Sequence, residues 1–104
     1  MRKVTAETVR AFFNGTKKTV GNTKITVVDG ETAMSLHNNI IALRSADGVV
    51  MINNKGYDTP TTKERLNGIL SHLNNDYIQQ KNFAWIWKHN GKVSDFPYAE
   101  WVTL

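Results

Sequence analysis

Two segments of the chain carry apolar residues at the spacing of an amphipathic helix. In the clearer one, residues 59–73, the positions i, i+3, i+4 and i+7 form a single apolar stripe: Leu66, Ile69, Leu70 and Leu73. The other segment runs to about Asn14, has Val9, Phe12 and Phe13 on one face, and is expected to end at Gly15. The sequence therefore predicts two helices, separated by about 45 residues.

Threonines are expected to cap both helices. Thr5 is the predicted N-cap of the first. Two starts are open for the second. In one, Thr61 and Glu64 form a capping box, and in the other Thr59 is the cap and Pro60 takes the first helical position.

Between the helices, apolar residues recur with a period of two, as in a strand with one buried face. The segment 23–28 alternates in this way, and Asp29-Gly30 favours a two-residue hairpin turn because such turns need positive φ at both positions. Three further segments continue the pattern: 31–37, 40–45 and 49–53. The sequence predicts a meander of four short strands.

After the second helix, residues 83–89 alternate again, with Phe83, Trp85 and Trp87 on one face. Asn90-Gly91 is a strong hairpin signal, and residues 92–96 are expected to return alongside. The predicted order is α-β-β-β-β-α-β-β in a single α+β domain over residues 1–104. We expect one antiparallel sheet that carries both helices on one face.

The composition describes one small globular domain. A chain of 104 residues can bury a single core. It has no cysteine, which excludes disulfides and thiolate metal sites, and no apolar run that approaches the roughly 20 residues of a membrane span. The N-terminal residues do not have the form of a signal peptide. We therefore expect a cytoplasmic protein without membrane contact.

The net charge of +4 leaves nucleic-acid binding as an alternative, although the 13 basic residues are spread along the chain. The predicted order resembles the topology of the double-stranded-RNA-binding domain: a helix, a meander, and a second helix with cations in its first turn. In that domain the first turn of the second helix meets phosphates. The residues expected to make this contact are Arg2, Lys3, Lys17, Lys18, Lys63 and Arg65.

No group of residues predicts catalysis. The histidines, His37, His72 and His89, lack the spacing of metal ligands, and the carboxylates are dispersed. The serines lack the context of a nucleophile elbow, and no glycine-rich phosphate motif is present. We expect no enzyme, no cofactor and no metal site.

Six large aromatic residues gather near the C-terminus: Phe83, Trp85, Trp87, Phe96, Tyr98 and Trp101. We expect Trp85 and Trp87 to fill the core, since large aromatic residues are highly buried on average. A pocket around either tryptophan that holds a nucleotide is an alternative. Trp101, near the end of the chain, is the expected exposed anchor for a partner.

Several of these segments resemble a group of small proteins of tailed bacteriophages and prophages. The matching segments are 21–23, 36–42, 56–59, the T-T-K-E-R-L-N block at 61–67, and 80–83. The group is expected to have glycine at Asn38 and tryptophan at Tyr57. The resemblance implies a phage protein made in the cytoplasm of an infected bacterium. Phage proteins of this size often bind and redirect a host or defence component.

The leading hypothesis is therefore a non-enzymatic phage accessory protein that binds a host or defence protein. Lys63 and Asn67 are expected to point away from the apolar stripe, and Arg65 to adjoin its edge. The predicted partner-binding residues are Tyr57, Lys63, Arg65, Asn67 and Trp101. The oligomeric state stays open, because an edge strand at the tail suits a second copy as well as a monomer.

Overall fold

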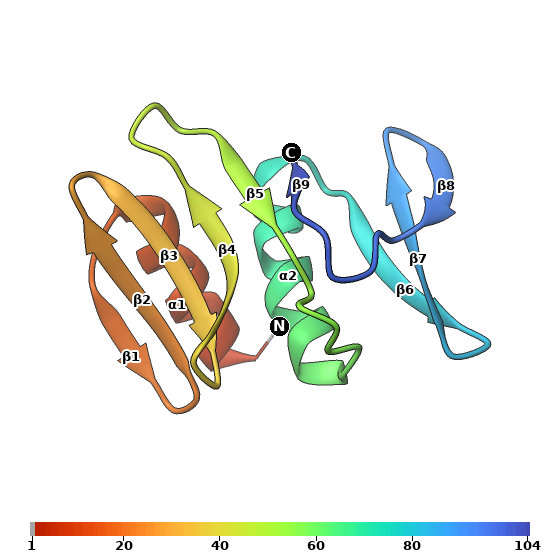
Figure 1. Cartoon of the computed structure of the whole chain (residues 1–104), viewed down its shortest axis with the longest axis horizontal. Helices are drawn as coiled ribbons and strands as arrows, with labels where there is room; N and C mark the ends of the chain where they lie inside the picture. Colours follow the sequence, from red (N-terminus) through yellow and green to blue (C-terminus); the bar gives the residue numbers. More distant parts are fainter. Residues whose placement is uncertain (1) are drawn as a thin grey trace.

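A computed structural model describes residues 2–104, and its elements follow the alternation of periods in the sequence (Figure 1). In chain order they are α1 (Lys3–Asn14), β1 (Lys18–Val20), β2 (Thr23–Val28), β3 (Glu31–Leu36), β4 (Asn39–Arg44), β5 (Val50–Ile52), α2 (Pro60–Leu73), β6 (Tyr77–Lys81), β7 (Ala84–His89), β8 (Lys92–Asp95) and β9 (Val102–Thr103). The predicted α+β class is confirmed.

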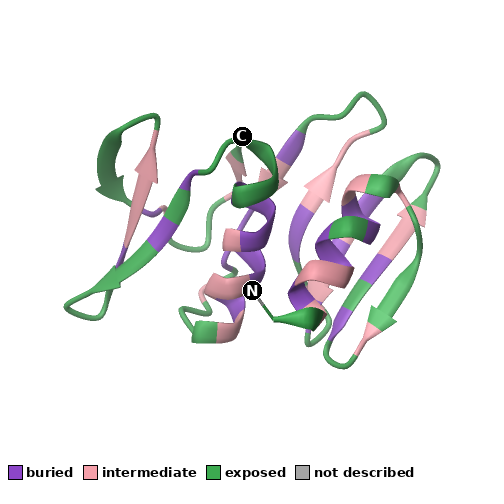
Figure 2. Ribbon diagram, turned by 180° about the vertical axis from the view of Figure 1, so that it is seen from behind, coloured by how far each residue is buried: buried purple, intermediate pink, exposed green. Residues whose placement is uncertain are grey.

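The strands form two antiparallel sheets, where the sequence suggested one. Six strands pair in the order β1-β2-β3-β4-β5-β9, and three more in the order β6-β7-β8. Both helices lie on one face of the larger sheet, and the smaller sheet lies beside α2 (Figures 1 and 2). The pattern missed β1 and β6 because they are short and rich in lysine, threonine and glutamine.

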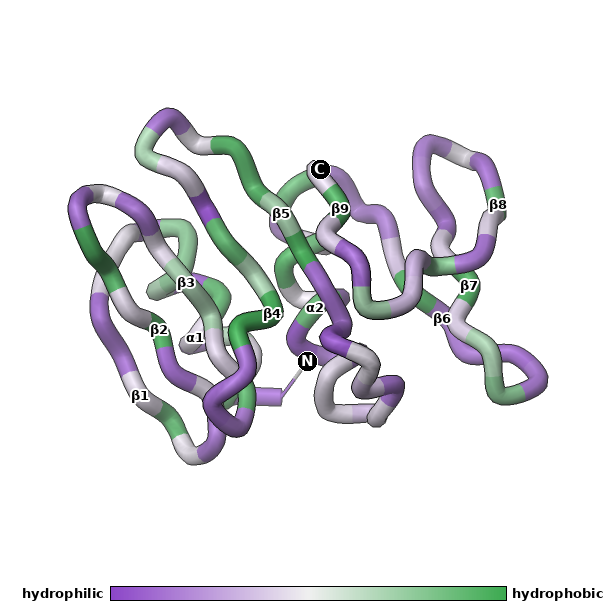
Figure 3. The backbone as a smooth tube through the Cα atoms, viewed as in Figure 1, coloured by the Kyte–Doolittle hydropathy of each residue, from purple (hydrophilic) through white to green (hydrophobic). Residues whose placement is uncertain are grey.

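The two helices lie side by side and run in the same direction. Near their starts, Arg65 of α2 hydrogen-bonds Thr5 of α1, and near their ends the ring of Phe13 stacks on His72 with centroids 3.9 Å apart. The predicted apolar faces lie between the helices and the sheet (Figures 2 and 3). Among the fully buried side chains are Phe12, Ile25, Met34, Ile41, Ile52, Leu66, Ile69 and Leu70. Leu73, the last residue of the predicted stripe, is exposed.

The N-cap of α1 differs from its prediction, whereas the N-cap of α2 follows one of the two predicted alternatives. Arg2 occupies the N-cap of α1 without a side-chain hydrogen bond, so the prediction of Thr5 as cap is wrong. For α2, Thr59 is the N-cap and its Oγ1 accepts from the amide of Thr62 at 3.2 Å. Pro60 follows at the first helical position, which confirms that alternative over a capping box at Thr61.

The hairpin turns follow the predicted chemistry. Asp29-Gly30 and Asn90-Gly91 both have positive φ at the two turn positions, as a type I′ turn requires. Asn82 and Phe83 adopt the same signs between β6 and β7. Phe83 therefore sits at the tip of a hairpin and is 91% exposed, and its expected place in the strand is wrong.

The smaller sheet packs on the core through its aromatic residues. Trp85 is buried, Trp87 packs against the core, and both rings lie 5.7 Å from the ring of Phe96. The core role expected for the two tryptophans is confirmed. Asn67 of α2 adds a polar link, because its amide bonds both the N–H and the C=O of Ile78 in β6.

Candidate interaction site

The predicted partner-binding residues fall in three different places. Tyr57 and Trp101 belong to two neighbouring surface segments; Tyr57 is exposed, whereas Trp101 is half-buried and so is less exposed than predicted. Lys63 and Asn67 line a cleft beside α2. Arg65 is buried between the helices and the sheet, with 3% of its side chain exposed.

The burial of Arg65 corrects its predicted role as a residue that contacts a protein partner or a phosphate. Its Nε donates to Thr23 Oγ1 at 3.0 Å, and its Nη1 donates to Thr5 Oγ1 at 2.6 Å and to Glu64 Oε1 at 3.0 Å. Burial lowers the pKa of the guanidinium, and the Glu64 carboxylate opposes that shift. This network joins α1, α2 and β2, so Arg65 has a structural role and its charge is not available to a partner.

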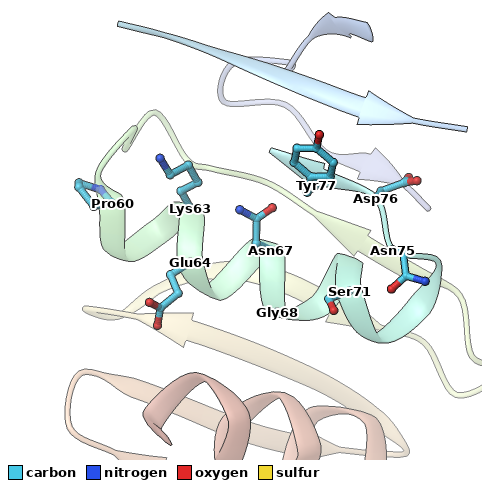
Figure 4. Close-up of a pocket in the computed structure, with 9 residues that line it drawn as sticks. All are labelled: Pro60, Lys63, Glu64, Asn67, Gly68, Ser71, Asn75, Asp76 and Tyr77. Atoms are coloured by element: carbon cyan, nitrogen blue, oxygen red, sulfur yellow. The ribbon is translucent and has the colours of Figure 1, made fainter. Parts of the chain in front are cut away.

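The cleft beside α2 has a volume of about 480 Å³ and runs between this helix and β6 (Figure 4). It is lined by Pro60, Lys63, Glu64, Asn67, Gly68, Ser71, Asn75, Asp76 and Tyr77. Several of these groups already have partners within the chain. Asp76, for example, hydrogen-bonds the imidazole of His89, and the Asn67 amide is held by Ile78. The polar side chains that remain for a ligand include those of Lys63, Ser71 and Asn75, which make no hydrogen bond or ion pair among the residues that the structure describes.

A second candidate site is formed by loop 53–58 and tail 97–101. We call it the aromatic surface, and it consists of Lys55, Tyr57, Tyr98 and Trp101. Tyr98 Oη donates to the carbonyl of Gly56 at 3.2 Å, and Lys55 Nζ lies 4.9 Å from the centre of the Trp101 ring. Tyr57 is 51% exposed and Tyr98 is 67% exposed. The structure thus places two of the predicted partner-binding residues, Tyr57 and Trp101, on segments shared with Tyr98, which the sequence grouped only with the C-terminal aromatic residues, and with Lys55, which it did not indicate.

Two buried asparagines hold the aromatic surface in shape. Asn54 Oδ1 accepts from the amides of Gly56 at 3.0 Å and Ala99 at 2.8 Å, which ties the loop to the tail. Asn53 Oδ1 accepts from the amide of Lys55 at 2.7 Å. Because the contacts are made on folding, a partner would not have to order these segments.

A groove of about 430 Å³ adjoins the aromatic surface at Tyr57. Buried Leu36 and Ile41 give it an apolar base, and the threonines at the start of α2 form one wall. An apolar base rimmed by hydroxyl groups suits the side chain of a protein partner better than a phosphate.

The basic residues of the nucleic-acid alternative are not brought together. Arg2 pairs with Glu64 at 3.4 Å, and Lys3 with Glu7 at 4.0 Å. Lys17 and Lys18 lie at the edge strand β1, whereas Lys63 lines the cleft next to β6. Within residues 2–104, no three histidine or acidic side chains are placed to hold a metal ion, and no helix is long and apolar enough to cross a membrane.

Comparisons with known proteins give one positive result. The family model described as Kyanoviridae Gp96 protein matches residues 1–103. No curated protein and no solved structure matches the chain.

Proposed function

The chain belongs to the Kyanoviridae Gp96 family of phage proteins, and we propose that it is a non-enzymatic accessory protein that binds a host or defence protein in the cytoplasm of the infected bacterium. The aromatic surface supports this proposal most directly. It gathers three large aromatic residues from two segments about 40 residues apart, and the buried Asn54 ties the backbones of these segments together through the amides of Gly56 and Ala99.

Physical chemistry favours a protein partner at this surface. Tyrosine and tryptophan are enriched among the residues that dominate binding energy, because they present much apolar area with few rotatable bonds. The exposed area of these side chains does not pack against other parts of the fold, so it is free to contact a partner. The groove next to Tyr57 can receive a side chain of the partner, and Lys55 adds one positive charge at the rim.

The experiment is affinity capture from lysate of the host, with and without nuclease and at two salt concentrations. The wild-type chain is expected to retain a discrete protein under all conditions. A double variant, Tyr57→Ala with Tyr98→Ala, is expected to weaken that complex about 30-fold or more, since truncating an interface anchor costs about 2 kcal/mol or more.

Phe83→Ala is the matched control, because it removes an aromatic side chain that is even more exposed but lies on the smaller sheet. Thermal unfolding of each variant establishes that the fold is kept. Capture that the double variant retains at wild-type strength would refute the assignment of this surface. Capture that disappears with nuclease or at high salt would instead support phosphate binding.

A further inference from the structure

In Figure 1 no helix lies over the face of the six-stranded sheet opposite α1 and α2, and the central outward residues of this face are apolar and half-buried. Cross-strand neighbours form one outward row across it: Thr26, Ala33, Leu43, Met51 and Thr103. Exposed faces of antiparallel sheets usually carry polar residues. This row contains no charge, and its three central positions are apolar.

Two opposite charges flank the row at equal separations. Lys24 lies two residues before Thr26 on β2, where it pairs with Ser35. Glu31 lies two residues before Ala33 on the antiparallel β3, so it sits on the other side of the row. Both side chains are exposed, and neither has an ion-pair partner within 4.0 Å among the residues that the structure describes.

This arrangement is complementary to itself under a two-fold rotation. When two sheets pack face to face, the two-fold axis lies in the contact plane. An axis along the apolar row brings each residue of the row against its own copy. The same rotation exchanges the two flanks, so it places Lys24 of one copy over Val28 of the other. Val28 is the cross-strand partner of Glu31, and the long lysine side chain can therefore reach that carboxylate.

We propose that this sheet face is a symmetric contact between two copies of the chain, with Leu43 and Met51 on the axis and two Lys24–Glu31 pairs beside it. We assign the face to a second copy of the chain because it carries both charges of each pair. The two-fold rotation brings Lys24 of one copy close to Glu31 of the other, and the reverse. The proposal does not depend on the aromatic surface, which consists of loop and tail residues.

The size of the face predicts a weak dimer. With strands about 4.8 Å apart and a rise of about 3.4 Å per residue, the face spans roughly 400 Å² in projection. Stable complexes usually bury about 800 Å² per partner. The dimer is therefore expected to form and dissociate with protein concentration.

Sedimentation equilibrium of the full chain over a range of concentrations is the direct test. We expect reversible dimerisation of the wild-type chain. Lys24→Glu and Glu31→Lys should each weaken it tenfold or more, because each reversal sets two pairs of like charges against one another. Lys92→Glu is the matched control, since it makes the same change of charge on the smaller sheet and should have little effect.

Mixing the two single variants distinguishes specific pairing from a general effect of charge. In a mixed dimer, the glutamate introduced at position 24 of one copy would face the lysine introduced at position 31 of the other. The unchanged Glu31 and Lys24 would also meet, so affinity should return toward that of the wild type. Leu43→Asp should abolish the dimer by placing two carboxylates on the axis. A chain that stays monomeric at all concentrations, or a mixture that associates no better than the single variants, would overturn the proposal.

Discussion

Replacing the buried arginine is the sharpest test of how the two helices are held together. Arg65→Met keeps most of the length and apolar volume of the side chain but removes the guanidinium. The change deletes two hydrogen bonds that join α2 to its neighbours, to Thr23 of β2 and Thr5 of α1, and a third that is made to Glu64 within α2. It leaves the hydroxyls of Thr5 and Thr23, both completely buried, with fewer partners.

The expected loss of stability follows from these contacts. Hydrogen bonds to a charged group contribute roughly 1.5–3 kcal/mol each, but the methionine also relieves the desolvation of a buried cation. The Glu64 side chain is 29% exposed and keeps its contact with Arg2, so it is not stranded. We therefore expect a net loss of about 3 kcal/mol, a large share of the roughly 5–15 kcal/mol that stabilises a small domain.

Urea denaturation followed by tryptophan fluorescence measures this loss, since Trp85 and Trp87 pack in the core. Lys63→Met is the matched control. It makes a similar change two residues earlier on the same helix, at a side chain that lines the open cleft, and should alter the free energy of unfolding by less than about 0.5 kcal/mol. An Arg65→Met variant as stable as this control would refute the structural role of the network.

Three further predictions concern other parts of the fold. Asn67→Ala should destabilise the chain by about 1–3 kcal/mol and speed hydrogen exchange at the amide of Ile78, because both backbone groups of that buried residue lose their partner. Phe83→Ser should leave the free energy of unfolding almost unchanged, since its ring is 91% exposed, and a large loss in denaturation would contradict the hairpin tip. The hydrogen bond from Ser45 holds the pKa of Asp47 below its ordinary value. The stabilisation from Asp47 is thus present above the unfolded pKa of about 3.9 and is lost as the pH falls through the folded value. A carboxyl NMR titration should show the lowered pKa, and Ser45→Ala should raise it toward the ordinary value, with backbone hydrogen bonds keeping part of the shift.

Local patterns were enough to predict the helices and the tight turns. The stripe of Leu66, Ile69 and Leu70 and the Asp-Gly and Asn-Gly pairs act within a few residues, so no distant contact was needed to interpret them. Thr5 and Arg65 were misplaced for the opposite reason. A threonine near a helix start and an arginine beside an apolar stripe are ordinary surface features until a segment 60 residues away lies against them.

Contacts between distant segments also explain why only half of the aromatic surface was predicted from the sequence. Tyr57 and Trp101 stood out as residue types, but Tyr98 and Lys55 gained significance only through contacts across more than 40 residues. The open sheet face was hidden as well, since the residues that flank its centre become neighbours only through the registers of β2, β3, β4, β5 and β9.

The two proposals together predict how binding should depend on dimerisation. A two-fold dimer would carry two aromatic surfaces, so a partner that is itself repeated or immobilised would be held at two points and dissociate more slowly. Such binding would in turn favour the weak dimer, because a ligand stabilises the state that it binds best. Lys24→Glu should therefore shorten the residence time on a densely immobilised partner while leaving the one-to-one affinity in solution unchanged. If Lys24→Glu instead weakened binding equally to the immobilised partner and to the partner in solution, the sheet face would contact the partner directly.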